Sequence, residues 1–402
     1  MGVKGFRAAG VPCGLKKNGA LDFALIVSEG PAIAAGVFTR NHVKAAPLLV
    51  SMDRLKSSRD RVRAVVINAG NANAMTGAQG LHDAEQTTQL VGQALDTGAD
   101  AVLVLSTGVI GQLLDMQKIA AGVDQAAHCL TRTWDDAARA IMTTDTRPKL
   151  RSVRVTQADG GTYTIAGIAK GAGMIAPNMA TMLGIVVTDA QLSAGQAQQA
   201  LDTAVPQTFN RIVVDGDMST NDTVFLLANG ASGAAVQTDA DTTQFQAALT
   251  AVCRELAQAI VRDGEGVTKF VTINVSGAVD DQAAWQIANT IATSPLVKTA
   301  FFGEDANWGR IVAAAGRAGV PLEVDSVRLS IAPGVDAPDS ADALLLVENG
   351  TRTDYDEADA TAIFQAAEIT VNLALGLGDG SARVWTSDLS IDYVKINADY
   401  RT

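Results

Sequence analysis

The sequence predicts a mixed α/β fold, and three observations support this prediction. Short apolar runs such as residues 64–67 and 101–105 have the length of buried strands. Longer stretches place apolar residues at helical spacing, and glycine, proline or asparagine separate the two kinds of segment. The 402 residues, of which 48% are hydrophobic, are enough to bury a large core. We therefore expect an α/β protein of two or three domains or subdomains.

The overall charge limits the classes of partner. The formal net charge is −12 and the pI is about 4.7, whereas nucleic acids and anionic membranes select basic surfaces. No apolar run approaches the roughly 18 residues of a membrane span, and the N-terminal residues lack the pattern of a signal peptide or presequence. We expect a cytoplasmic protein that acts on small molecules and binds neither nucleic acid nor membrane.

Cysteine and histidine are scarce, which excludes several kinds of chemistry. The three cysteines are far apart, and the three histidines lack metal-ligand spacing; these residues are Cys13, Cys129, Cys253, His42, His82 and His128. A disulfide framework and a zinc site are disfavoured. The sequence also has no GxSxG elbow for a serine hydrolase. We expect no metal, and a catalytic base that need not be a side chain.

In the first part of the chain, residues 5–70 read mostly as sheet, including the apolar run at 48–51. A helix is predicted over residues 83–96, closed by Gly98. Residues 115–142 are helical by the spacing of their apolar side chains. These assignments leave two loops, rich in asparagine and hydroxyl residues, after the strands at 64–67 and 101–105.

The first of these loops contains Asn68, Gly70, Asn71 and Asn73. Asparagine and glycine adopt positive φ angles easily, so the loop is either a structural turn or a part of a substrate site. The second loop begins Ser106-Thr107-Gly108. A hydroxyl and backbone N–H groups at one strand end can stabilise an oxyanion, although a simple glycine turn has the same sequence pattern.

The second part of the chain continues the α/β pattern. The predicted elements are a hairpin around residues 159–161, helices at 190–205, 242–263 and 284–291, a strand at 268–275, and strand-like runs within 317–386. Acidic residues at Asp215, Asp217 and Asp222 superficially suggest a calcium loop. They lack the glycine and terminal glutamate of an EF-hand, so we interpret them as framework residues.

The stretch from Lys170 to Asp189 contains Thr181, a hydroxyl residue without a neighbouring histidine. If the Ala180-Thr181 peptide bond were cut, Thr181 would gain an α-amino group with a pKa of about 8 that can accept the hydroxyl proton. Pro177 favours a turn just before it. By composition alone, a threonine at this position is explained by β propensity.

Glu265 lies in a Gly-Glu-Gly loop just after a predicted helix end. The helix dipole disfavours a carboxylate there, which hints at a function, although a solvated loop glutamate is the ordinary explanation. Four motifs, taken together, resemble those of the ornithine acetyltransferase (glutamate N-acetyltransferase) family: STG at 106–108, KGAGMIAPNMAT at 170–181, DGEG at 263–266 and NADYRT at 397–402.

The resemblance implies an α/β/β/α two-sheet sandwich with outer helices, of the N-terminal-nucleophile type, to which both halves of the chain contribute. It implies self-cleavage into an alpha chain, residues 1–180, and a beta chain, residues 181–402, with a smaller C-terminal subdomain at about 280–402. The implied site residues are the cleavage pair Ala180 and Thr181, the nucleophile Thr181, the oxyanion pair Thr107 and Gly108, and the substrate contacts Thr146, Lys170, Thr181, Glu265, Asn397 and Thr402. Relatives often have an aromatic residue at Arg147 and arginine at Lys395.

The implied activity is ping-pong transfer of an acetyl group from N2-acetyl-L-ornithine to L-glutamate through an acetyl-Thr181 intermediate. No cofactor is implied, and whether acetyl-CoA is a second donor is left open. The two cleaved chains would associate, as a heterotetramer of two alpha and two beta chains. Two alternatives remain: a related N-terminal-nucleophile amidase or aminopeptidase, and a non-enzymatic amino-acid-binding protein.

Overall fold

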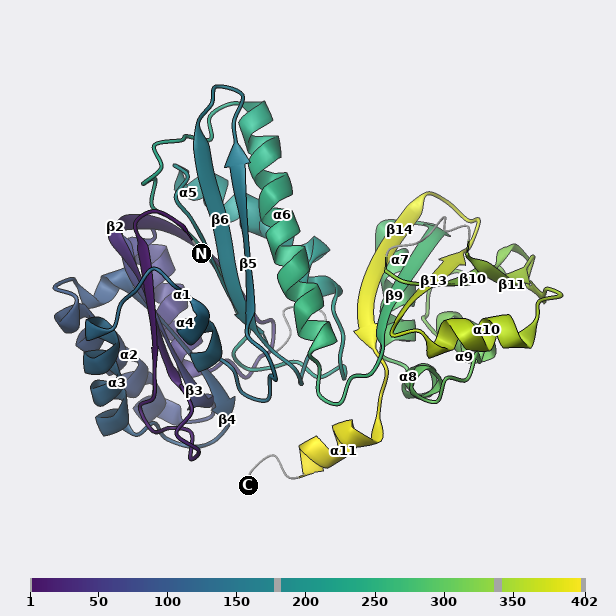
Figure 1. The fold of residues 1–402 in the computed structure, drawn as a ribbon, viewed down its shortest axis with the longest axis horizontal. Coiled ribbons are helices and arrows are strands. Elements are labelled where there is room, and N and C mark those ends of the chain that lie inside the picture. Colours follow the sequence, from purple (N-terminus) through teal and green to yellow (C-terminus); the bar gives the residue numbers. More distant parts are fainter. Residues whose placement is uncertain (1, 177–181, 336–341, 399–402) are drawn as a thin grey trace. The chain divides into compact units, whose positions relative to one another are not determined.

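A computed structural model describes residues 2–176, 182–335 and 342–398, and these residues form two compact units (Figure 1). The first unit contains the chain up to Met174, residues 182–210 and Asp217–Ile260. The second contains Ile175, Ala176, Arg211–Gly216 and the described residues from Val261 onward. Among the described residues, no helix is both long enough and apolar enough to cross a membrane.

An eight-stranded sheet forms the centre of the first unit, in the order β4-β3-β2-β8-β7-β6-β5 with β1 paired to β2. Its strands are β1 Phe6–Val11, β2 Phe23–Phe38, β3 Val62–Asn71, β4 Val102–Val109, β5 Lys149–Thr156, β6 Thr162–Lys170, β7 Leu183–Thr188 and β8 Thr223–Ala228. The long strand β2 pairs with β1 and β3 through its first part and with β8 through its second, with a register shift between Val27 and Ala32. Strand β2 therefore belongs to both parts of the sheet.

The two parts of this sheet pack against each other. One core cluster contains Ile67 and Leu105 from the first part, and Ile168, Ile185 and Phe225 from the second. All five side chains are fully buried. Burial of this apolar surface is the main stabilising term for the unit.

Helices cover both outer faces of the first unit. Its helices are α1 Ala46–Ser58, α2 Gly77–Ala94, α3 Met116–His128, α4 Asp135–Ala140, α5 Ala194–Gln207 and α6 Asp239–Arg262. Val91 of α2 and Ile119 of α3 lie in the core beneath the first part of the sheet. On the second part, α6 runs beside β5 and β6 (Figure 1). Its Phe245 packs on Tyr163, with ring centroids 5.8 Å apart. The predicted two-sheet sandwich with outer helices is confirmed.

Strands from both halves of the chain are interleaved in this sheet. Strand β7, which follows residue 181, pairs with β6, which precedes it, and β8 pairs with β2 in the same way. Both halves of the sequence therefore contribute to one sheet, as expected.

Several predicted elements differ from those observed. Residues 48–51 belong to helix α1 rather than to a strand, because Pro47 occupies its first turn and Leu48, Ser51 and Leu55 are buried at helical spacing. Four consecutive apolar or small residues cannot distinguish a buried helix from a strand. The helical prediction over residues 115–142, by contrast, is confirmed: the segment forms the two helices α3 and α4.

The second unit contains a six-stranded sheet in the order β12-β11-β10-β13-β9-β14. Its strands are β9 Phe270–Ala278, β10 Arg328–Pro333, β11 Leu344–Glu348, β12 Thr351–Arg352, β13 Glu368–Ala374 and β14 Gly380–Ser387, and its helices are α7 Asp281–Ala292, α8 Pro295–Phe302, α9 Trp308–Gly316, α10 Glu357–Gln365 and α11 Ile391–Ala398. Ile273, Ile287 and Phe364 lie in the separate core of the second unit. Across the described chain, short 3-10 helices lie at Ala99–Ala101, Phe209–Arg211 and Val324–Ser326.

Candidate functional site

Thr107 and Gly108 lie at the end of the edge strand β4, where Thr107 is buried. Gly108 has a φ of 133°, and a Cβ atom placed on it would lie 2.3 Å from the carbonyl carbon of Gly70 on β3. A side chain at this position is excluded by backbone contact and by the left-handed φ angle. The pair therefore presents one hydroxyl and a glycine backbone at a rigid strand end.

The asparagine side chains beside this pair hold the end of β3 in place through hydrogen bonds. Asn68 Nδ2 donates to the backbone oxygen of Asn71 at 2.8 Å, and Asn68 Oδ1 accepts from Ser106 Oγ at 2.6 Å. Asn71 Nδ2 donates to the carbonyls of Gln112 and Leu113. Asn68, Gly70 and Asn71 thus belong to strand β3 rather than to a loop, and these bonds join the end of β3 to Ser106 on β4 and to residues 112 and 113. They support a structural role for the asparagines.

Lys170 ends strand β6 and is almost completely buried. Its Nζ donates to Thr143 Oγ1 at 2.8 Å, and the next backbone N–H, of Gly171, donates to Asp145 Oδ1 at 2.7 Å. Asp145 also accepts from Lys149 Nζ at 2.6 Å and from the Thr143 N–H at 3.0 Å. A carboxylate thus fixes the loop in which Lys170 and Thr143 meet.

The charge of Asp145 is stabilised by these neighbours. Burial alone would raise the pKa of Asp145, but the positive charges of Lys170 and Lys149 and the Gly171 N–H outweigh it and lower the pKa to about 2. Asp145 is therefore ionised at neutral pH. Thr146, which the family resemblance indicates as a substrate contact, is exposed. Asp145 was not predicted as a site residue, although its spacing of four positions from Lys149 is a signal for an ion pair.

Ala180 and Thr181 lie outside the described residues. Their flanks are described: Lys170 of β6 pairs with Leu183 of β7, and the Met182 N–H donates to Asp222 Oδ1 at 3.0 Å. The predicted framework role of Asp215 and Asp222 fits these contacts, since Asp215 Oδ1 accepts from the Ile175 N–H at 2.9 Å.

In the second unit, Glu265 and Asn397 are in direct contact. Asn397 Nδ2, on helix α11, donates to Glu265 Oε2 at 2.7 Å. The loop after Glu265 packs closely against the start of α11. Ser390 Oγ donates to the Gly266 carbonyl at 2.6 Å, and a Cβ on Gly266 would lie 2.5 Å from the Tyr393 nitrogen. The structure thus brings together two predicted substrate residues that are 132 positions apart. Thr402 lies outside the described residues.

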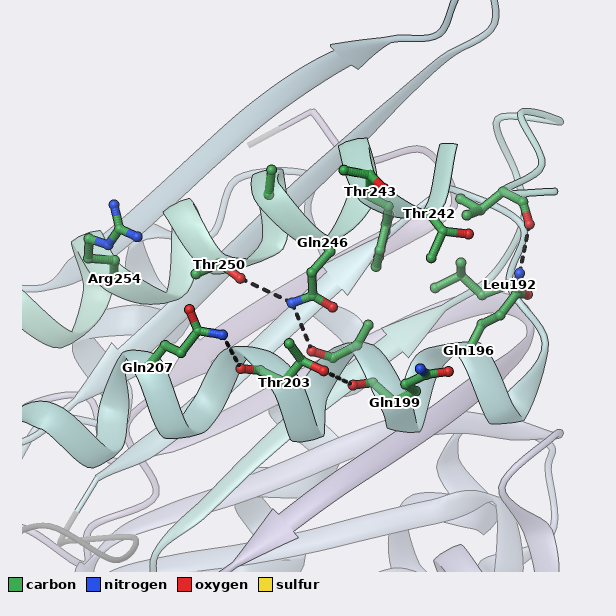
Figure 2. Close-up of a pocket in the computed structure, with 14 residues that line it drawn as sticks. Leu192, Gln196, Gln199, Thr203, Gln207, Thr242, Thr243, Gln246, Thr250 and Arg254 are labelled. Atoms are coloured by element: carbon green, nitrogen blue, oxygen red, sulfur yellow. Dashed lines mark hydrogen bonds between the residues drawn. The ribbon is translucent and has the colours of Figure 1, made fainter. Parts of the chain in front are cut away.

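A groove lies on the outer face of the first unit, between α5 and α6, with a volume of about 650 Å³ (Figure 2). Amide and hydroxyl side chains line it, and many bond within it: Gln246 Nε2 donates to Thr250 Oγ1 at 3.0 Å, and Gln207 Nε2 to the Thr203 carbonyl at 3.0 Å (Figure 2). None of the predicted site residues lines this groove. Within the described ranges, no cluster of three or more His, Cys, Asp or Glu side chains could hold a metal ion.

One family profile and several curated relatives match nearly the whole chain. The profile of the ArgJ family matches residues 7–402. The chain is 50% identical to the arginine biosynthesis bifunctional protein ArgJ of Geobacter sulfurreducens, over 100% of both chains. It is 46% identical to ArgJ 1 of Nostoc sp., over 99% of this chain and 97% of that one. A crystal structure of the ArgJ protein of Bacillus halodurans is 38% identical with a TM-score of 0.49, covering 53% of this chain and 97% of that chain.

Both the family match and the curated relatives span the strand ends, the loop at 143–149 and the Glu265–Asn397 contact. Membership excludes the alternative of a non-enzymatic amino-acid-binding protein. The chain belongs to the ArgJ family, the ornithine acetyltransferases that its motifs resemble, and is an acetyltransferase.

Proposed function

We propose that this protein moves the acetyl group of N2-acetyl-L-ornithine to L-glutamate by a ping-pong mechanism, after autocatalytic cleavage of the Ala180-Thr181 bond. The observation that carries this proposal is the hydrogen bonding of Met182, the residue that follows Thr181 in the sequence. Its N–H is bonded to the fully buried Asp222, and the neighbouring Asn221 bonds the Ser106 carbonyl, one residue before Thr107. The residue after the proposed nucleophile and the residue before the proposed oxyanion pair are thus bonded to adjacent side chains.

Cleavage would begin with attack of the Thr181 hydroxyl oxygen on the Ala180 carbonyl carbon. The C–N bond breaks, the hydroxyl proton passes to the departing nitrogen, and an ester joins Ala180 to Thr181. Water then hydrolyses this ester. The products are the Ala180 carboxylate and a threonine that carries both a hydroxyl and a free α-amine.

In the transfer reaction, the α-amine of Thr181 accepts the hydroxyl proton as the oxygen attacks the acetyl carbon of N-acetylornithine. The Thr107 hydroxyl and the Gly108 N–H stabilise the oxyanion. The C–N bond then breaks, the proton passes to the leaving ornithine nitrogen, and acetyl-Thr181 remains. Attack by the amine of glutamate reverses these steps, releases N-acetylglutamate and restores the free hydroxyl.

The charges of the remaining residues suit amino-acid substrates. The ammonium of Lys170 would bind a substrate carboxylate, and the carboxylate of Glu265 a substrate ammonium. Thr146, Asn397 and Thr402 would supply neutral hydrogen bonds. Asn397 already bonds Glu265, which supports a shared role for these two residues.

Two finer features belong to the same proposal. Acetyl-CoA would serve as a second acetyl donor if the protein is bifunctional like its named relatives. The cleaved chains would remain associated, as a heterotetramer of two alpha and two beta chains. The strand order β2-β8-β7-β6 supports their association, because β7 and β8 of the beta chain would pair with β6 and β2 of the alpha chain.

A product assay tests the proposed transfer. With N-acetylornithine and glutamate, we expect equal amounts of ornithine and N-acetylglutamate, and little free acetate. Without glutamate, one acetyl group should accumulate on the chain that begins with Thr181, as measured by intact mass. Release of acetate at the same rate with and without glutamate would instead indicate the amidase alternative. A third reaction with acetyl-CoA and glutamate decides the second donor.

A further inference from the structure

Five consecutive polar residues, Ser219 to Thr223, are buried just before the apolar part of β8. Buried polar side chains lower stability unless they are hydrogen-bonded, so such a run needs a reason. In this run, the neighbouring side chains of Asn221 and Asp222 bond two different strands: Asn221 bonds Ser106 on β4, and Asp222 bonds Met182 just before β7.

The Asn221 amide bonds two strand ends simultaneously. Its Nδ2 donates to the Ala72 carbonyl at 2.7 Å, just past β3, and to the Ser106 carbonyl at 2.8 Å, on β4. Its Oδ1 accepts from the Thr220 hydroxyl. All three bonds fix the orientation of the amide, because a rotated amide would put an oxygen against two carbonyl oxygens.

The bond to Ser106 bears directly on Thr107. The peptide bond is planar, so the Ser106 carbonyl and the Thr107 N–H belong to one rigid plane. Holding that carbonyl therefore sets the direction in which the chain enters Thr107 and Gly108. Misplacement of such groups by about 1 Å costs on the order of 100-fold in rate.

The Asp222 carboxyl holds the backbone just before the start of β7. Its Oδ1 accepts from the Met182 N–H at 3.0 Å, and the Met182 carbonyl accepts from the Thr223 N–H at 3.1 Å. The backbone of Asp222 is also held, because its carbonyl accepts from the Thr39 N–H at 2.9 Å. Burial raises the pKa of the Asp222 carboxyl well above its usual range, against the opposing effects of the Met182 N–H and the Lys170 charge.

We propose that Asn221 and Asp222 are positioning residues: they hold Ser106, which leads into the oxyanion pair, and Met182, which follows the proposed nucleophile in the sequence, at one separation. Because adjacent α-carbons are about 3.8 Å apart, one short rigid segment spans both groups. Each acts through a backbone group, Asn221 through the Ser106 carbonyl and Asp222 through the Met182 N–H. This inference rests on the proposed function, since it assigns the two ends to that reaction.

Asn221→Ala is the first test variant. Per folded molecule, we expect both self-cleavage and kcat for acetyl transfer to fall by at least about tenfold, while KM for N-acetylornithine changes less than about threefold. Self-cleavage is followed by the two bands on a denaturing gel over time. A purely structural residue would lower the amount of folded protein without changing these rates.

Ser51→Ala is the matched control. Ser51 is completely buried and its Oγ donates to the Val104 carbonyl at 2.7 Å and accepts from the Val104 N–H at 2.9 Å. It thus makes two bonds to the same strand, β4, two residues before Ser106. We expect Ser51→Ala to lower the unfolding temperature and to leave both rates within about twofold.

Asp222 provides a second test if Asn221→Ala does not fold. Asp222→Asn keeps an oxygen that accepts from Met182 and should cleave and transfer at nearly the wild-type rate, whereas Asp222→Ala should lose about tenfold or more. Equal loss in both variants would overturn a positioning role. Rates for Asn221→Ala equal to those of Ser51→Ala would overturn it as well, while leaving the proposed function intact. A wild-type protein that neither cleaves nor transfers would overturn both.

Discussion

A backbone angle and a backbone contact determine which residue can stand at position 108. The φ of 133° is left-handed, and a methyl group there would meet the Gly70 carbonyl carbon at 2.3 Å. Strand β4 cannot move away without breaking its pairing with β3, so the contact cannot be relieved. The glycine therefore serves the fold of this strand end as well as the proposed oxyanion site.

We predict that Gly108→Ala destabilises the protein by roughly 2 to 4 kcal/mol and lowers acetyl transfer at least 100-fold. Gly111→Ala is the control, because Gly111 also has a positive φ, of 84°, but among the described residues no atom beyond its chain neighbours lies within 4 Å of its Cβ position. It should lose about 1 kcal/mol and keep its activity. Thermal unfolding and the transfer assay check both; equal loss for the two glycines would contradict the steric explanation.

Asp145 predicts a pH dependence. Its folded pKa of about 2 lies below the ordinary 3.8, so its stabilising contribution is present above about pH 4 and disappears as the pH falls toward 2. We expect wild-type protein to lose roughly 2 kcal/mol from this group over that range, and Asp145→Asn to lack this loss. Urea unfolding at pH 2 to 7 measures the difference.

At neutral pH, Asp145→Asn should be less stable by about 3 kcal/mol, because the buried Lys149 ammonium loses the carboxylate charge that lies 2.6 Å from it. Asp189→Asn is the matched control: Asp189 is equally buried, but accepts from the backbone N–H groups of Lys4 and Thr164. We expect a smaller loss there. Equal losses would show that the charge of Lys149 is unimportant.

Candidate site residues could be predicted from the sequence, but their hydrogen-bond partners could not. Thr107, Gly108, Lys170, Glu265 and Asn397 could be named because each lies in a motif that resembles a family. Their partners could not be named, because Asp145 and Asn221 act through chain segments brought together only by folding. A carboxylate in a hydroxyl-rich loop has the same sequence pattern whether it is solvated or paired with a buried lysine.

At the scale of elements, helix α8 is anchored to the end of β14 by one buried lysine. Lys298 Nζ donates to Thr386 Oγ1 at 3.1 Å, to Ser387 Oγ at 3.2 Å and to the Ser387 carbonyl. The adjacent Asp388 accepts from the Thr268 and Lys269 N–H groups, a few residues after Glu265. This network holds the segment that leads into α11 and Asn397.

Burial lowers the pKa of Lys298 to about 7, although Asp388 and Asp215 oppose the shift. Since the unfolded chain binds the proton up to about pH 10, this lysine makes stability rise with pH between about 7 and 10. We predict that wild-type stability rises relative to Lys298→Met by up to about 1.4 kcal/mol per pH unit in this interval. Urea unfolding at pH 7, 8 and 9 checks this; parallel pH profiles would contradict it.

Element types were predictable where the periodicity was long and not where it was short. Apolar spacing identified α6 and α7 almost to their ends. The run at 48–51 was too short to distinguish α1 from a strand. Helix α5 begins at Ala194, a few residues later than predicted, because the preceding Ser193 forms a capping box with Gln196.

For the whole molecule, the main feature is that the proposed cut falls between two paired strands. Strands β6 and β7 pair over six residue positions, from Ile165 with Thr188 to Lys170 with Leu183. After a cut at Ala180-Thr181, this pairing and that of β2 with β8 would join two separate chains. Sequence alone gave the mixed fold, but the order of the strands could not be read from it, because nonlocal pairing leaves no periodic signal.

We predict that the cleaved protein stays together in native buffer. It should elute as one species from gel filtration and give two bands on a denaturing gel, because separation would expose unpaired strand edges and the shared core. Urea should separate and unfold the chains in one step. Elution of two smaller species in native buffer would contradict the interleaved sheet.

The most direct test of the account is Thr181→Ala, measured for self-cleavage and acetyl transfer in the same preparation. The account predicts one uncut chain on a denaturing gel and loss of transfer by at least about 1000-fold, because both the hydroxyl and the new α-amine are missing. Circular dichroism confirms folding. A Thr181→Ala protein that still appears as two chains and transfers acetyl groups at the wild-type rate would contradict the central claim.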